Sequence, residues 1–75
     1  MLITIIYNTD YRDEANSLKL DVINEWEDVS VNLMGIRDAI NNAKYQVQID
    51  RDVIYHSDSV TDNNSIIINS IKERL

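Results

Sequence analysis

The segment LITIIY, residues 2–7, decides how this chain folds. Four of its six residues are β-branched and the run is almost entirely apolar, which predicts a strand buried on both faces at the centre of a mixed sheet. The polar segment NTDYR, residues 8–12, follows and is expected to form a turn. Asp10 or Asp13 is placed to cap a helix after this turn, with Glu14 in its first turn.

Residues 13–27 are expected to form that helix. Its apolar residues fall on one continuous stripe at helical spacing: Ala15, Leu18, Val22, Ile23 and Trp26. Leu20 lies off the stripe, so we expect it either to be partly covered or to belong to a contact surface.

A second strand is predicted over residues 29–34, where apolar and polar residues alternate. Gly35 is expected to break this strand. A short helix is expected to follow, because apolar residues recur there at helical spacing: Ile36, Ala39, Ile40 and Ala43.

The last part of the chain predicts a β-hairpin and a helix. Residues 45–49 alternate, residues 53–55 are apolar, and the polar residues 50–52 form the connection of a hairpin over 45–56. Thr61 or Asp62 is placed to cap a helix over residues 63–75. Its apolar row is Ile67, Ile71 and Leu75, with Ile68 beside it.

The predicted order is therefore β-α-β-(short α)-β-β-α, an α/β fold in one domain spanning residues 1–75. The first two strands, joined by a helix, are expected to be parallel. The final hairpin and helix complete a mixed four-stranded sheet covered by two helices.

Composition restricts the possible functions. The chain has no cysteine, which excludes disulfide exchange and a zinc–thiolate site. Its net charge of −6 argues against direct nucleic-acid binding, which needs a basic surface. No apolar run approaches the roughly 20 residues of a membrane span, and the first residues do not resemble a signal peptide. We expect a cytoplasmic protein, in the host cytoplasm if the abundant Ile and Asn reflect an AT-rich phage or viral genome.

Four stretches carry a resemblance to a known family: ITIIYNTDYR, SLKLDVINEWEDVSVNL, YQVQIDRDVIYHSDS and SIIINSIKERL. Together they resemble the selenoprotein W (Rdx) family and, through a hairpin of the form Q-V-x-I-D, the glutaredoxins. The resemblance implies that residues 1–75 form a single small thioredoxin-like domain.

The departures from that family concern its chemistry. A Cys-x-x-Cys or Cys-x-x-selenocysteine motif follows the first strand in the Rdx family, whereas the matching positions here run from Asn8 to Tyr11. Glutaredoxin-like members also carry a cis-proline before the third strand, whereas this chain has no proline and reads Ala43, Lys44, Tyr45 there. The resemblance therefore implies a redox-inactive relative.

Other candidate chemistry is weakly supported. His56 with Asp58, and Asp50 with Asp52, are more typical of a strand end and a turn than of a metal site. No nucleophile motif and no Gly-rich phosphate loop is present. We therefore expect no enzymatic activity, no cofactor and no metal.

Two binding hypotheses follow. The first is a non-catalytic module that binds another protein, or a second copy of itself, through residues Asn8, Thr9, Asp10, Tyr11 and Arg12, with Leu20 as an apolar contact. The second is an inhibitor that mimics nucleic acid through the carboxylates in and just after the first helix: Asp13, Glu14, Asp21, Glu25, Glu27 and Asp28.

Overall fold

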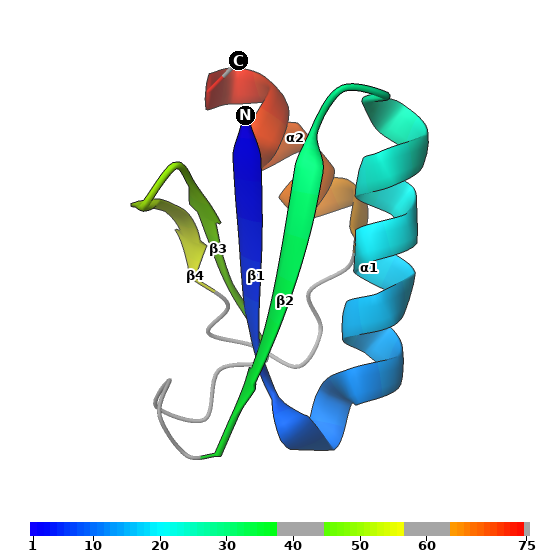
Figure 1. Cartoon of the computed structure of the whole chain (residues 1–75), viewed down its shortest axis with the longest axis vertical. Helices are drawn as coiled ribbons and strands as arrows, with labels where there is room; N and C mark the ends of the chain where they lie inside the picture. Colours follow the sequence, from blue (N-terminus) through cyan, green and yellow to red (C-terminus); the bar gives the residue numbers. More distant parts are fainter. Residues whose placement is uncertain (38–44, 57–63, 75) are drawn as a thin grey trace.

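Four strands form one mixed β-sheet in the computed structural model, which describes residues 1–37, 45–56 and 64–74 (Figure 1). The strands are β1 (Leu2–Asn8), β2 (Ser30–Ile36), β3 (Tyr45–Ile49) and β4 (Asp52–His56), in the order β2-β1-β3-β4. β1 is parallel to β2 and antiparallel to β3, which is antiparallel to β4. The central position of β1 and its parallel pairing with β2 confirm the sequence prediction.

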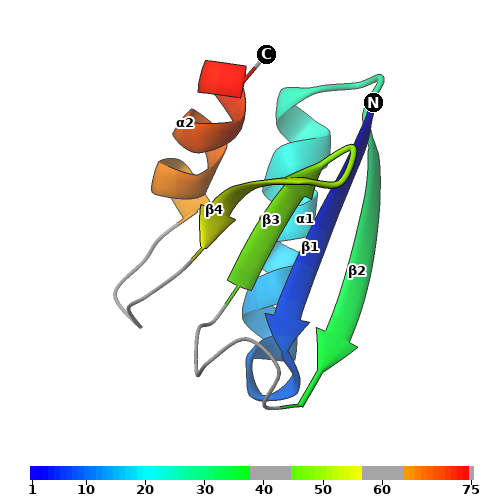
Figure 2. The ribbon, with the colours of Figure 1, turned by 90° about the vertical axis from the view of Figure 1, so that its left-hand side faces the viewer.

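Both helices pack on the same face of this sheet, as Figure 2 shows. The 3-10 turn η1 (Thr9–Tyr11) leads directly into α1 (Arg12–Glu25), which packs against β1 and β2. The second helix, α2 (Asn64–Arg74), contacts β4 and α1. Neither of these two helices has the length and apolar character of a membrane-spanning segment.

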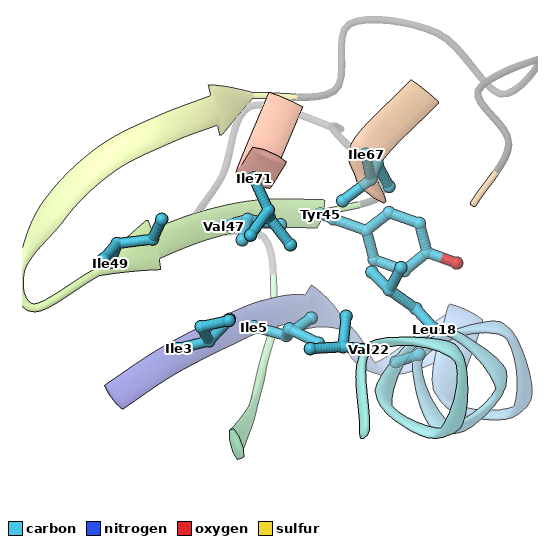
Figure 3. Close-up of a cluster of buried hydrophobic side chains, with 10 residues drawn as sticks. Ile3, Ile5, Leu18, Val22, Tyr45, Val47, Ile49, Ile67 and Ile71 are labelled. Atoms are coloured by element: carbon cyan, nitrogen blue, oxygen red, sulfur yellow. The ribbon is translucent and has the colours of Figure 1, made fainter. Parts of the chain in front are cut away.

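The core lies between the helices and the sheet. It consists of residues that are at most 9% exposed: Ile3, Ile5, Ala15, Leu18, Val22, Tyr45, Val47, Ile49, Ile67 and Ile71. Figure 3 shows Ile67 and Ile71 of α2 lying over β3, while Leu18 and Val22 of α1 lie over β1 and Tyr45. Every second residue of β1 and β3 enters this core because side chains alternate across a strand.

The opposite face of the sheet is only partly buried, which corrects the expectation that LITIIY is buried on both faces. Thr4 and Ile6 are half-buried, while Leu2 is exposed. Met34 of β2 and Val53 of β4 are exposed as well. Apolar side chains therefore reach solvent on the face that α1 and α2 leave uncovered.

The boundaries around β2 differ from the prediction. Gly35 does not break the strand, because Gly35 and Ile36 pair with Tyr7 and Asn8 of β1. The predicted short helix over residues 35–43 therefore loses Gly35 and Ile36 to β2, and Arg37 forms a bend. The rest of that prediction, residues 38–43, lies outside the described residues. The predicted caps Thr61 and Asp62, and Leu75, lie outside them too.

The stripe on α1 is narrower than predicted. Ala15, Leu18 and Val22 are buried, but Ile23 is 40% exposed because it lies 100° further around the helix than Val22. Trp26 caps the helix in an extended conformation and is half-buried against the core rather than being part of the helical stripe. Leu20 is off the stripe, as predicted, and 60% exposed.

The hairpin has the predicted extent and a strained turn. Asp50 and Arg51 form its two-residue connection with φ angles of 50° and 89°. The Asp50 backbone nitrogen donates to the Leu2 carbonyl oxygen at 3.0 Å, and the Leu2 nitrogen donates to the Asp50 carboxylate at 3.1 Å. Asp50 therefore joins the turn to the start of β1, a structural role for this carboxylate.

Candidate functional site

The candidate site lies where the parallel strands β1 and β2 end. β1 finishes at Asn8, and the next four residues turn the chain into α1. The Asn8 side-chain oxygen accepts a hydrogen bond from the Asp10 backbone nitrogen at 3.0 Å. This local bond closes the turn at the end of the strand, as asparagine side chains commonly do.

The predicted caps are replaced by this asparagine. Tyr11 occupies the position before α1 and makes no side-chain capping bond, while Asp13 lies inside the first turn of the helix. The Asp10 backbone nitrogen donates to the capping side chain of Asn8, so Asp10 is the capped residue and not the cap. The prediction that Asp10 or Asp13 caps the helix is therefore wrong, because the 3-10 turn η1 places the cap three residues earlier, at Asn8.

Five of the six predicted contact residues are contiguous and partly accessible. Asp10 and Arg12 are exposed, and Asn8, Thr9 and Tyr11 are half-buried. The exposed side chains have opposite charge, so the segment offers both a carboxylate and a guanidinium beside an aromatic ring. Such a set suits recognition of a polar protein surface.

Leu20 does not belong to this cluster. It lies two turns further along α1, about 12 Å from Arg12 along the helix axis. It lies about 160° around the helix from the buried Leu18 and Val22, so it points away from the sheet and is 60% exposed. The structure thus separates the predicted contact residues into two surfaces.

Tyr7 and Gly35 lie next to the candidate segment and were not among the predicted site residues. They are register partners across β1 and β2, and Tyr45 of β3 is the partner of Tyr7 on its other side. A Cβ atom at Gly35 would lie 2.9 Å from the Tyr7 hydroxyl oxygen. The only glycine in the chain therefore makes room for a tyrosine ring at the base of the site.

A polar groove with a volume of about 370 Å³ lies between α1 and α2. Its lining residues are mostly amides and charged side chains: Asp21, Asn24, Glu25, Asn64, Ser65, Ile68, Asn69 and Lys72. Asn64 donates to Asp21 at 2.6 Å and to the Ser17 hydroxyl at 3.3 Å, and Lys72 pairs with Glu25 at 2.9 Å. These contacts join the two helices, so the polar residues of the groove have a structural role.

A metal site would need a group of ligating side chains among the described residues. Within residues 1–37, 45–56 and 64–74, no group of three or more His, Asp or Glu side chains could hold a metal ion. His56 lies at the end of β4, exposed, with its Nδ1 3.4 Å from the Gln46 amide across the hairpin.

The predicted acidic surface is present but partly engaged. All six carboxylates in and just after α1 are exposed, yet Glu25 forms an ion pair with Lys72 and Asp21 accepts from Asn64. These two face α2, and helical spacing places Glu14 in the same row, with Asp13 of the first turn beside it. Glu27 and Asp28 follow the helix and lie outside this row.

No protein-family model, no curated protein and no solved structure matches this chain.

Proposed function

We propose that this chain is a non-catalytic, thioredoxin-like module that binds another protein through the segment from Asn8 to Arg12. The observation that carries the proposal is the position of this segment. It connects the central strand β1 to α1 at the carboxyl end of two parallel strands, where α/β sheets commonly bind ligands.

The thioredoxin-like assignment rests on the sheet and on the resemblance together. A helix joins two parallel strands, and an antiparallel hairpin and a last helix complete the domain. The selenoprotein W family carries its Cys-x-x-Cys or Cys-x-x-selenocysteine motif directly after the first strand, and this chain carries Asn8 to Tyr11 there. A segment without thiols can still contact a protein partner through its side chains.

The chemistry of the segment supports protein binding in particular. Arg12 and Tyr11 are residue types enriched in the energetically important centres of interfaces. Asp10 adds an exposed carboxylate beside them, and Asn8 fixes the turn through its own hydrogen bond. A turn that is already ordered loses little conformational entropy when a partner binds.

Site-specific photo-crosslinking tests the proposal. A benzophenone side chain introduced at Tyr11 is expected to crosslink a discrete partner in a lysate of the organism that encodes the chain. The same group at Glu73, which is exposed on α2, serves as the matched control and is expected to give no such adduct.

Competition then identifies the residues that bind. Excess unlabelled wild-type chain is expected to abolish the adduct, whereas an Asp10→Ala/Arg12→Ala variant is expected to compete at least about tenfold less well. Both side chains are exposed, so circular dichroism should show the variant folded. A variant that competes as well as the wild-type chain would exclude this segment as the binding surface.

A second candidate is the acidic inhibitor that imitates nucleic acid. The exposed carboxylates Asp13, Glu14 and Glu27, with the net charge of −6, favour it. Binding to a basic site should then weaken steeply as salt is added. An Asp13→Asn/Glu14→Gln variant would lose affinity for the partner, while Asp10→Ala/Arg12→Ala would not.

A further inference from the structure

β2 is the outer strand of the sheet on the side of α1. Among the residues that the structure describes, β2 pairs with β1 alone, and its other edge presents the backbone groups of a seven-residue strand. The sequence of the strand, SVNLMGI, contains none of the lysines or prolines that commonly protect such edges. Figure 2 shows β2 as the outermost strand of the sheet, its open edge on the side away from β1, with α1 behind the sheet.

The side of α1 that faces away from α2 carries one exposed apolar residue among polar ones. Ser17, Asp21 and Glu25 face α2, since Asn64 and Lys72 bind them. The 100° spacing of helical residues places Ile23 on the opposite flank, together with Arg12, Asn16 and Lys19.

Apolar groups also accompany the open strand. Ile23 is 40% exposed on this flank of α1, which packs over β1 and β2. On the strand itself, Val31 and Leu33 are only partly buried on the face that α1 covers, and Met34 is exposed on the other face. A second strand placed beside β2 would cover part of this surface.

The strand is complementary to itself. In an antiparallel pair, opposite residues point to the same face of the sheet. A symmetric pairing of β2 must therefore place even-numbered residues opposite even-numbered ones, and odd-numbered residues opposite odd-numbered ones. With Asn32 on the two-fold axis, Val31 lies opposite Leu33 of the second copy on the helix face, and Ser30 lies opposite Met34 on the other. Both copies then place their helices on the same side of a continuous sheet.

Charges at the two ends of the strand favour the same register. Glu27 and Asp28 precede β2 and Arg37 follows it, all three exposed. Pairing centred on Asn32 brings Glu27 of each copy next to Arg37 of the other, so the two-fold symmetry produces this contact twice. With Arg12 and Lys19 on the helix flank, this side of the molecule carries three basic and two acidic residues, although the whole chain has a net charge of −6.

We propose that two copies of this chain associate through β2, paired antiparallel about Asn32, so that their two sheets become one. The proposal is independent of the binding segment from Asn8 to Arg12, because no residue of that segment takes part in the pairing. The exposed edge, Ile23 on the flank of α1 and the end charges would all be used by this single contact.

Sedimentation equilibrium of the full chain tests the proposal. The wild-type chain is expected to form a dimer in a concentration-dependent manner. Asn32→Lys places two like charges opposite each other at the two-fold axis and should weaken the association by at least about tenfold. Asn69→Lys, the same change at an exposed position of α2, is the matched control and should leave the association within about twofold of wild type.

A charge exchange tests the register. Glu27→Arg alone and Arg37→Glu alone should each weaken self-association, because each creates two like-charged pairs across the contact. A mixture of the two variants should form a heterodimer with wild-type affinity, since every contact again joins opposite charges. Glu73→Arg and Arg51→Glu make the same changes in net charge at exposed positions outside the contact and should not reproduce this pattern.

Three results would overturn the proposal. The first is a wild-type chain that stays monomeric at all concentrations reached. The second is a dimer that Asn32→Lys leaves intact or that Asp10→Ala/Arg12→Ala dissolves. The third is a mixture of the Glu27→Arg and Arg37→Glu variants that associates no more tightly than either variant alone.

Discussion

At the scale of single residues, Arg51 in the β3–β4 turn holds the clearest backbone strain. Its φ angle of 89° lies in the region that only glycine adopts without cost. Arg51→Gly is therefore expected to raise the free energy of unfolding by about 1 kcal/mol, after the greater flexibility of glycine in the unfolded chain is included. Urea denaturation followed by circular dichroism measures this change.

The neighbouring residue Asp50 provides the matched control. Its φ angle of 50° would also be relieved by glycine, but its carboxylate accepts the hydrogen bond from the Leu2 nitrogen. Asp50→Gly loses this bond, worth about 1 kcal/mol, and should therefore stabilise less than Arg51→Gly or not at all. An Arg51→Gly variant that is no more stable than the wild-type chain would show that the turn angles do not limit stability.

At the scale of elements, α2 is held to the sheet by a short apolar row. Ile71 is fully buried over Val47 of β3, while Ile66 on the same helix is 46% exposed. Ile71→Ala is expected to lower the free energy of unfolding by about 2–4 kcal/mol, a large part of the stability of so small a domain. Ile66→Ala, measured in the same urea titration, should cost under about 1 kcal/mol.

The ion pairs of α2 are expected to contribute little beside that row. The Lys72 and Glu25 side chains remain 51% and 41% exposed, so water screens their interaction. Equal losses from Ile71→Ala and Ile66→Ala would indicate that the helix is held by its polar contacts instead.

The elements with strong periodicity could be predicted from the sequence, and their ends could not. LITIIY identifies the central strand because a continuous β-branched run strongly favours a strand, although the face opposite Ile3 and Ile5 is only partly buried. Gly35 was expected to end β2, but it pairs with Tyr7 of β1 and leaves space for the tyrosine ring. This contact joins two strands that are distant in the sequence, so the residues around Gly35 do not predict it. Ile23 was expected in the core, but burial depends on where the sheet lies beneath α1.

The candidate site shows the same division between local and long-range information. The turn after β1 follows from its polar residues, and the Asn8 bond to Asp10 is local. The two partners of Tyr7, Gly35 and Tyr45, come from other strands and required the sheet register. A tyrosine at the end of the first strand and a single glycine were the only signals for this contact in the sequence.

At the scale of the whole molecule, net charge opposes the association proposed for β2. Each chain carries −6, so two copies repel each other at long range, while the pairs of Glu27 with Arg37 are exposed and individually weak. Raising ionic strength from about 0.01 M to about 0.1 M shortens the screening length from about 30 Å to about 10 Å. Salt should therefore strengthen self-association by about 3–10-fold in sedimentation experiments.

Binding of the chain to a basic nucleic-acid site would have the opposite salt dependence, because the charges that meet there attract. The sign of the salt effect thus separates the two contacts in one buffer series. Self-association that weakens as salt is added would mean that attraction between charged groups dominates the contact. The backbone and apolar surface of β2 would then not be its main source of affinity, since screening leaves those contributions unchanged.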